Sequence, residues 1–315
     1  MEFASLTEAD AEDAVAFIEE GTATAWPLRS WVNSGMRGIV VKDSGGIVGI
    51  LPLRPREVTI LGEVMTAYYC TAVRVTESYR NSGLGSEMLR IAVSKFCNPT
   101  AFVCVVRSDP QSLAFNWYRK NGFHVVAEVS SHDINGDFCA ENPHDLRTSR
   151  LETVEQSVLT GINEVLARAK VWTGVVGRNR SVELWRCDLQ FHYYSNLYRD
   201  AELFICDGES GTLVGLVAST EMQSQPRIDI LDFEYTDTQS FLSLANSVVG
   251  HYSARHGIPV RWNLGVVEGR KLGVESSWVE RWRTNLMVHL HESLDPGRVE
   301  LLRTHGWRYR QLEFV

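Results

Sequence analysis

The sequence predicts an α/β (α+β) fold that occurs twice along the chain, and three observations lead to this prediction. Residues 68–75 are rich in β-branched and aromatic side chains, as in a strand, and residues 86–93 carry apolar side chains at helical spacing. Residues 101–106 form a short apolar run bounded by turn residues, which is typical of a buried strand. The chain has 315 residues, which suits about two domains, and its second half shows a similar order of patterns.

The first half predicts alternating strands and helices. The first of these are a strand at Phe3–Leu6, a helix at Glu8–Glu20 with Thr7 as its N-cap, a helical stretch within residues 22–33 that Pro27 interrupts, and a hairpin of strands Gly38–Lys42 and Ile47–Leu53. After them come the strand at residues 68–75, the helix at residues 86–93, the strand at residues 101–106, a helix that starts at Asp109-Pro110 and ends at Gly122, and a strand at Phe123–Val129.

A polar segment at residues 131–152 predicts a boundary between two domains. It contains Asn135-Gly136 and Pro143 and few apolar residues, so it reads as a connection that holds an edge strand. We therefore expect one domain at residues 1–140 and a second at residues 150–315. The segment Leu151–Ala169 then predicts a helix with one apolar face.

The second half repeats the pattern of the first. Phe204–Leu216 is similar to Val40–Ile50, since both place a glycine-containing turn between two apolar runs. The elements expected after it are a strand at Ile228–Phe233, a helix within residues 238–256, a strand at Val260–Leu264 and, at Val299–Trp307, a counterpart of the helix that ends at Gly122. We interpret the chain as a tandem of two related domains.

The turn from Arg80 to Gly85 is the best candidate for a binding site. It lies between a predicted strand and a predicted helix, and the first N–H groups of a helix have no partner within that helix. The helix dipole favours negative charge there, and Gly83 and Gly85 let the backbone approach a pyrophosphate closely. The pattern alone is weak in a chain with 24 glycines, so it needs support from elsewhere in the sequence.

That support comes about thirty residues later, and together the two stretches resemble the GCN5-related N-acetyltransferase (GNAT) family. Residues 75–85 are similar to the acetyl-CoA motif of that family, in which Arg or Gln leads x-x-Gly-x-Gly/Ala. The residues that match its second motif are Ala114, Tyr118, Lys120, Gly122 and Phe123. Gln111 stands where that motif usually has Asn. The alternative is a glycine turn in another α/β fold.

The resemblance implies that each domain is a mixed, largely antiparallel sheet flanked by helices. It also implies that acetyl-CoA (CoA) is the cofactor and that a strand N–H polarises the thioester carbonyl. The residues expected to bind the cofactor are Val73, Arg74, Val75, Arg80, Asn81, Ser82, Gly83, Leu84, Gly85, Ser86 and Asn116. Tandem domains are known in mycothiol synthase-like and Eis-like members of the family, and the motifs do not single out either.

The catalytic acid and base are predicted with unequal support. The resemblance assigns Tyr118 as the acid that protonates the leaving thiolate, and the alternative is a core tyrosine. Histone-type members carry a glutamate base at a position that Tyr69 occupies here. Glu63 is the nearest carboxylate upstream, with a solvated loop residue as the alternative. Cys70 is either an acyl-accepting thiol or a buried, inert cysteine, and strand alternation favours the latter.

The second half lacks the chemistry of the first. Its counterpart of the turn, Glu234–Phe241, has no glycine and two added carboxylates, which would block and repel a pyrophosphate. Leu301 stands at the position that corresponds to Tyr118. We therefore expect no CoA in this half. Six of the nine tryptophans lie in it, which indicates either a domain or homodimer surface or core packing.

Composition narrows the function classes. The formal net charge is −8, which argues against a nucleic-acid-binding surface, and no apolar run is long enough to span a membrane. The N-terminus shows no secretory signal. None of the six cysteines forms a Cys-x-x-Cys pair, so we expect a cytoplasmic protein without a metal site.

The resemblance to the GNAT family implies an acetyl-CoA-dependent N-acetyltransferase that acts on a small-molecule amine, such as an amino sugar or an amino-acid-like metabolite. Trp26, Arg29 and Trp31 either line the acceptor site or pack the first helices on the sheet. A longer acyl donor or an O-acceptor is a second interpretation. A protein that binds CoA without turnover is a third.

Overall fold

The computed structural model describes residues 1–20, 37–60, 63–70, 73–96, 101–107, 112–134, 144–168, 181–183, 185, 198–220, 226–274, 278, 280–290, 297 and 300. The predictions for residues 22–33, Asp109-Pro110 and 299–307 lie outside these ranges, as do Trp26, Arg29, Trp31 and Leu301.

The described elements of the first half alternate much as the sequence predicts. They are β1 (Glu2–Ser5), α1 (Ala11–Glu19), β2 (Arg37–Asp43), β3 (Gly46–Ile60), β4 (Glu63–Cys70), β5 (Arg74–Val75), α3 (Leu84–Phe96), β6 (Ala101–Arg107), α4 (Leu113–Lys120) and β7 (His124–Ile134). Short 3-10 helices lie at Glu8–Asp10 and Glu77–Tyr79.

The second half contributes the remaining elements. They are β8 (Asp145–Arg150), a 3-10 helix (Leu151–Thr153), α5 (Gln156–Arg168), β9 (Tyr198–Asp207), β10 (Thr212–Thr220), β11 (Arg227–Tyr235), α7 (Phe241–His256), β12 (Val260–Gly265), α8 (Val266–Lys271) and β13 (Glu280–Leu290). The predicted boundary segment holds the end of β7 and the whole of β8, which forms one edge of the sheet.

The strands form one mixed sheet, which confirms the predicted fold class. Their order is β1-β2-β3-β4-β6-β13-β7-β12-β11-β10-β9-β8, and β5 pairs with β3 beside this path. The neighbours in this path are antiparallel except for two pairs, β4 with β6 and β11 with β12. In each exception a helix connects the two strands, α3 in the first half and α7 in the second, because a parallel pair needs a crossover connection.

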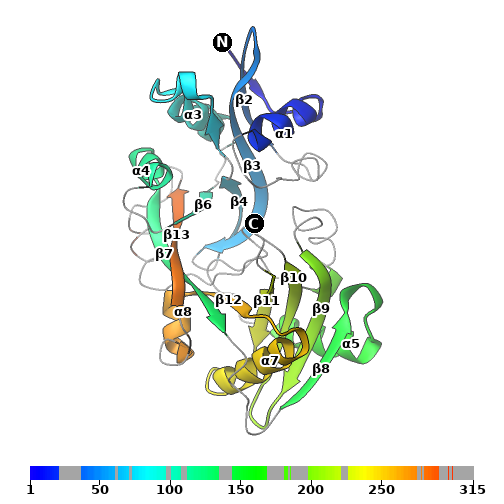
Figure 1. Cartoon of the computed structure of the whole chain (residues 1–315). Helices are drawn as coiled ribbons and strands as arrows, with labels where there is room; N and C mark the ends of the chain where they lie inside the picture. Colours follow the sequence, from blue (N-terminus) through cyan, green and yellow to red (C-terminus); the bar gives the residue numbers. More distant parts are fainter. Residues whose placement is uncertain are drawn as a thin grey trace.

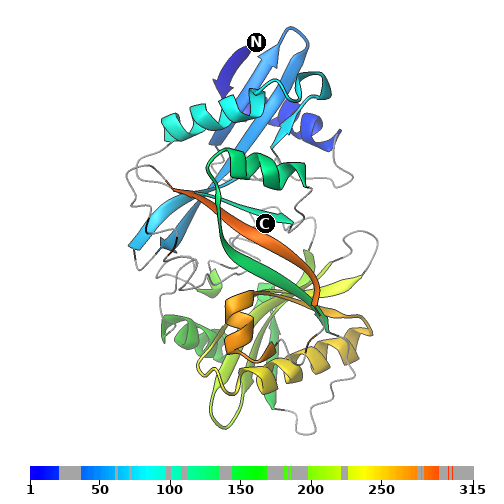
Figure 2. The same ribbon diagram turned by 90° about the vertical axis from the view of Figure 1, so that its left-hand side faces the viewer.

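The two halves share strands at the centre of the sheet (Figures 1 and 2). β13 comes from the second half of the chain, yet it lies between β6 and β7 of the first half. β7 in turn pairs with β12 of the second half, with Val260 opposite Ile134. The predicted boundary between residues 140 and 150 stays a prediction, and the sheet runs across it.

Some strand and helix boundaries differ from the predictions. The predicted strand at residues 68–75 is interrupted, since Val73 lies outside any strand and β5 covers only Arg74–Val75. β3 continues beyond Leu53 to Ile60, because it pairs with β4 over that length. α4 begins at Leu113, where the Oγ of Ser112 accepts the N–H of Phe115 at 3.4 Å as an N-cap.

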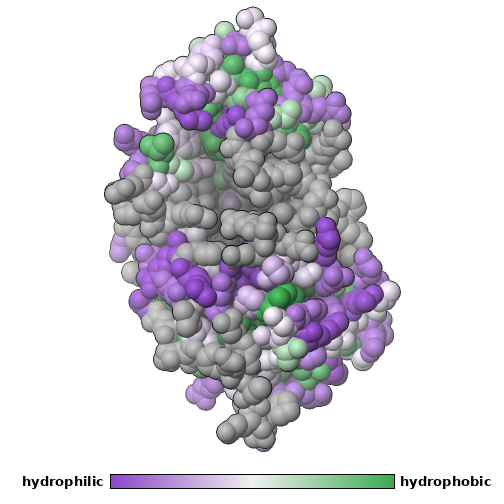
Figure 3. All heavy atoms as spheres, in the orientation of Figure 1, coloured by the Kyte–Doolittle hydropathy of each residue, from purple (hydrophilic) through white to green (hydrophobic). Residues whose placement is uncertain are grey.

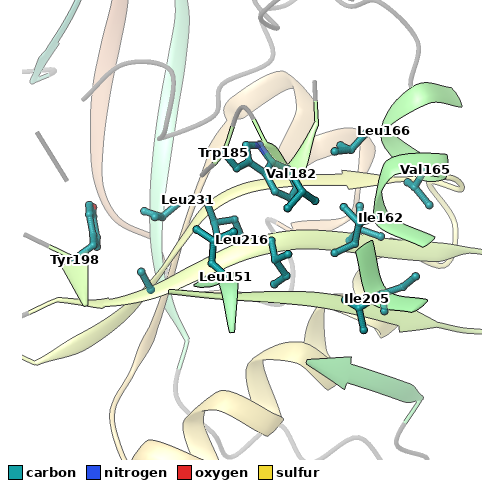
Figure 4. Close-up of a cluster of buried hydrophobic side chains, with 14 of the residues drawn as sticks. Leu151, Ile162, Val165, Leu166, Val182, Trp185, Tyr198, Ile205, Leu216 and Leu231 are labelled. Atoms are coloured by element: carbon teal, nitrogen blue, oxygen red, sulfur yellow. The ribbon is translucent and has the colours of Figure 1, made fainter. Parts of the chain in front are cut away.

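Helices cover both faces of this sheet. One cluster of buried side chains packs α3 and α4 on the first half, and a second packs α7 on β10 to β12. Figure 4 shows part of a third cluster, in which α5, Val182 and Trp185 cover β9 to β11. This third cluster also includes Phe17 and Ile18 of α1 and Ile50 of β3.

The described surface over α3 and α5 is mostly hydrophilic on the face in Figure 3. Within the described ranges, no helix is both long and apolar enough to cross a membrane. Trp185, Trp262 and Trp278 are buried, so core packing accounts for these three tryptophans.

Candidate functional site

The turn between β5 and α3 has a backbone shape that requires its glycine. Asn81 and Gly83 both have left-handed conformations, with φ values of 62° and 85°. A Cβ at Gly83 would meet no atom within 4 Å, so the space beside this residue is open. Glycine is thus required here for its conformation, and it leaves room for a ligand.

Several N–H groups of this turn face no protein acceptor. Tyr79, Arg80 and Ser82 donate to backbone carbonyls of the turn at distances of 2.9, 3.1 and 3.4 Å. The N–H groups of Gly83, Leu84, Gly85 and Ser86 have no partner among the described residues. They begin α3, where the helix dipole adds positive potential, so the turn fits the oxygens of a phosphate group.

The second predicted motif lies against this turn. A Cβ at Gly85 would lie 3.3 Å from Nε1 of Trp117, so the absent side chain lets the indole of α4 pack on the first turn of α3. The sequence analysis did not predict this contact. The spacing of the two motifs could not reveal it, because the contact depends on how α4 crosses the sheet.

Tyr118 follows Trp117 on α4 and lies inside the same hydrophobic cluster as Leu84 and Met88 of α3. Its side chain is 6% exposed, and its ring lies edge-on to Phe123 at a centroid distance of 4.9 Å. The N–H of Phe123 donates to the carbonyl of Tyr118 at 3.1 Å, since the chain turns at Gly122 with a φ of 83°. This position is compatible with both predicted roles, so the assignment as an acid stays a prediction.

The parallel strands β4 and β6 separate beside the turn. They pair only from Ala67 with Ala101 to Tyr69 with Val103. Beyond this point β6 pairs only with β13, as far as Arg107. The segment that follows β4 leads instead to β5, which pairs with β3. The two strands therefore diverge on the side that leads to the glycine turn. Val73, Arg74 and Val75 lie along one edge of this opening.

Tyr69 is the last paired residue before the strands diverge. It is 8% exposed and lies opposite Arg54 of β3, which is 2% exposed. Its neighbours Tyr68 and Cys70 belong to the cluster under α3, so Tyr69 points to the other face of the sheet. Its place is suitable for contact with an acceptor at the opening.

Glu63 lies at the opposite end of β4. The structure places it in a strand, opposite Ile60, and not in a loop. Six residues separate it from Tyr69, which corresponds to about 20 Å along a strand. The assignment of Glu63 as the base stays a prediction.

Cys70 is 2% exposed, and its burial raises the pKa of its thiol well above the ordinary range. A thiol that stays protonated is a poor nucleophile, so the inert interpretation holds.

The other predicted cofactor residues lie at the rim of the turn. Arg80, Asn81 and Ser82 are exposed, and the Nε of Arg80 donates to the carbonyl of Val75 at 3.4 Å. Asn116 is exposed on α4.

A hydrogen bond that the sequence analysis missed ties this turn to the β2–β3 hairpin. The hydroxyl of Tyr79 donates to Oδ2 of Asp43 at 2.9 Å, and the N–H of Gly45 donates to Oδ1 at 2.8 Å. The N–H of Gly45, followed by the Tyr79 hydroxyl, lowers the pKa of Asp43. The hairpin thus holds the turn in place.

The corresponding region of the second half contains protein groups instead of open space. The N–H of Ser240 donates to Oδ2 of Asp237 at 2.7 Å, immediately before α7. The N–H of Ser240, with the N–H groups of Gln239 and Thr238, lowers the pKa of Asp237. A carboxylate of the protein therefore lies at the start of α7, where the first half leaves N–H groups without a partner.

Aromatic rings fill the space beside this second turn. Phe233 lies 5.8 Å from Phe241 and 5.1 Å from Trp262, measured between ring centroids, and Trp262 lies 5.3 Å from Trp278. β11 and β12 pair over only three residues, as β4 and β6 do. The second half thus repeats the diverging parallel strands but closes them with side chains.

Comparisons with known proteins identify this fold. No family model and no curated protein sequence matches the chain. Among solved structures, a GCN5-related N-acetyltransferase from Anabaena variabilis has a TM-score of 0.61 and 14% identity, covering 91% of this chain and 72% of its own. A GCN5-related N-acetyltransferase from Kribbella flavida has a TM-score of 0.59 and 13% identity, and the match covers 93% of this chain and 72% of that protein. Eis1 from Mycobacterium abscessus has a TM-score of 0.56 and 13% identity, and the match covers 93% of this chain and 74% of that protein. The chain therefore has the fold of the GCN5-related N-acetyltransferases.

Proposed function

We propose that the chain is an acetyl-CoA-dependent N-acetyltransferase that acetylates the amine of a small molecule, an amino sugar or an amino-acid-like metabolite, by direct attack. One observation carries the proposal: a turn whose N–H groups at Gly83 to Ser86 have no partner among the described residues lies beside two diverging parallel strands. The first feature fits a pyrophosphate and the second leaves an opening for an extended chain that ends in a thioester.

Each part of the site has a role in this proposal. Bound acetyl-CoA supplies the activated acetyl group. The N–H groups of residues 83–86 bind its phosphates, and a backbone N–H within Val73–Val75 polarises the carbonyl. The acceptor approaches on the face of Tyr69, and Tyr118 donates a proton to the leaving thiolate. A reducing cytoplasm suits Cys70 and Cys206, which are free and buried.

The test is a screen of small amines with purified protein and acetyl-CoA, with detection of the free thiol that transfer releases. We expect amine-dependent thiol release with at least one class of small amine. Parallel calorimetric titration with CoA should show binding. A protein that binds CoA but releases no thiol with any amine would contradict the transferase and would favour a CoA-binding protein without turnover.

A further inference from the structure

The two residues of β5 point to opposite faces of the sheet. Val75 pairs with Gly49, where a Cβ would lie 3.2 Å from Sδ of Met88, so Val75 belongs to the face of α3. Arg74 pairs with Ile50, which belongs to the cluster of buried side chains that includes Phe17 of α1. Arg74 therefore lies on the face of α1, across the sheet from the start of α3.

The guanidinium of Arg74 packs on an aromatic ring and has no carboxylate partner among the described residues. Its Cζ lies 4.5 Å from the centroid of the Phe17 ring, a cation–π contact. Its Nη1 is buried and has no hydrogen-bond partner among the described residues, and none of their carboxylates forms an ion pair with it. A buried donor without an acceptor costs free energy, so this geometry favours an oxyanion from outside the protein.

A second buried cation lies on the same face. Arg54 is 2% exposed and follows Ile50 by four residues in β3. The side chains of Ile50 and Arg54 therefore lie on the same face of the sheet, about 13 Å apart along the strand. Arg54 has contacts of its own in the protein. It lies opposite Tyr69. Two arginine side chains therefore lie on the α1 face, and the proposal below rests on Arg74 alone.

We propose that Arg74 binds an oxyanion of the acceptor, so that the acceptor carries a carboxylate or phosphate group as well as its amine. This inference rests on the proposed function and narrows its substrate class. An anion held at Arg74 lies on the opposite face of the sheet from the start of α3, where the phosphates of CoA would bind. The amine of the same molecule can then reach the opening between the two faces.

The experiment uses titration in the presence of saturating CoA, so it does not depend on turnover. The probes are matched pairs with and without the anion: phenylalanine and phenethylamine, serine and ethanolamine, phosphoethanolamine and ethanolamine. In at least one pair, the anionic member should bind roughly 10- to 100-fold more tightly than its partner, as expected for a hydrogen-bonded charge. The first two pairs report on a carboxylate and the third on a phosphate.

Three variants assign this preference to one side chain. Arg74→Met should abolish it, and Arg74→Lys should retain part of it. Arg37→Met is the matched control, because Arg37 is exposed and its Nη1 donates to the hydroxyl of Tyr68, which belongs to the α3 side. Thermal unfolding of each variant establishes that it folds.

Two results would overturn the proposal. One is equal binding of both members in every pair. The other is an Arg74→Met variant that keeps the preference or that loses CoA binding instead, since the guanidinium would then serve no acceptor anion. Failure of thiol release in the amine screen would contradict the proposed transfer but would leave these titrations able to decide the role of Arg74.

Discussion

The two glycines of the turn are needed for different reasons: Gly83 for its backbone conformation, and Gly85 for the space that its missing side chain leaves. Gly83 has a φ of 85°, and a Cβ at this residue would meet no atom within 4 Å, so the protein itself does not need the empty space. Gly85 differs, since its absent side chain accommodates Trp117 of α4. The two glycines of the motif therefore serve different purposes, Gly83 for its backbone conformation and Gly85 for helix packing.

We expect Gly83→Glu to weaken CoA binding by roughly 100-fold or more, because a carboxylate would lie beside the phosphates and like charges in contact cost several kcal/mol. Calorimetric titration measures this loss. Gly257→Glu is a matched control, since Gly257 also has a positive φ, 66°, and open space around it, but ends α7 in the second half. Unchanged affinity in the Gly83 variant would show that the phosphates bind elsewhere.

Tyr118→Phe should lower turnover by about 10²- to 10⁴-fold, the usual effect of removing a general acid, and should leave CoA affinity nearly unchanged. Steady-state kinetics and titration check the two parts separately. Tyr235→Phe controls for the loss of a hydroxyl, because the Tyr235 hydroxyl lies in the second half, where it donates to Oε1 of Glu268 at 3.5 Å. Near-normal turnover of the Tyr118 variant would make this residue a packing residue.

At the scale of elements, the beginnings of α3 and α7 differ in the groups that lie beside their first residues. Both helices follow a strand of a parallel pair that diverges after three residues. At α3 the N–H groups of residues 83–86 have no partner among the described residues, whereas just before α7 Asp237 accepts the N–H of Ser240, and Phe241 packs against Trp262. At the second turn, the carboxylate of Asp237 and the aromatic side chains around Phe241 thus occupy this region.

This comparison predicts one CoA site per chain, and it predicts that Asp237→Ala creates no second one, because the aromatic rings remain. Titration should give a stoichiometry of one for both proteins. Two equal sites in the wild-type chain would contradict the closed state of the second turn.

The same variant has a predictable pH dependence of stability. The N–H of Ser240 lowers the pKa of Asp237, so the ionised carboxylate stabilises the folded state above its unfolded pKa, and this contribution disappears as pH falls through the lower, folded value. Asp237→Ala should therefore have a lower Tm than the wild type at pH 7, and the difference should shrink toward pH 3. Calorimetric scans at several pH values measure it, with Asp237→Asn as the charge-specific comparison.

Local patterns predicted these elements well but not their partners. The glycine turn, α3 and the β2–β3 hairpin follow from spacing and turn chemistry within short windows. The break at Val73 and the extension of β3 to Ile60 were missed, because both depend on pairing across the sheet. Sequence periodicity also could not predict the contact of Gly85 with Trp117, because it depends on tertiary packing. The same holds for Arg74, whose Nη1 has no partner among the described residues.

At the scale of the whole molecule, the shared strands make the two halves depend on each other. β13 pairs with β6 from Leu290 opposite Ala101 to Thr284 opposite Arg107, and it pairs with β7 on its other side. Removal of the second half would therefore leave the inner edges of β6 and β7 unpaired. Unpaired edges expose N–H and C=O groups and promote aggregation.

We expect a fragment of residues 1–150 to be poorly soluble and poorly active, and coexpression with residues 151–315 to restore both properties. Size-exclusion chromatography, CoA titration and thiol release compare the fragment, the coexpressed pair and the whole chain. A monodisperse fragment with full activity on the same acceptor would show that the second half is dispensable.

The place of β13 also has a consequence for the order in which the protein matures on the ribosome. β6 and β13 are far apart in the sequence, so their contact raises the contact order of the chain and slows its folding. The first half leaves the ribosome early and already contains the residues of the glycine turn. Its sheet nevertheless stays incomplete until residues 280–290 have been synthesised. Ligand-competent protein would then arise only from nearly full-length translation products. Truncated products would remain open and available to chaperones and proteases.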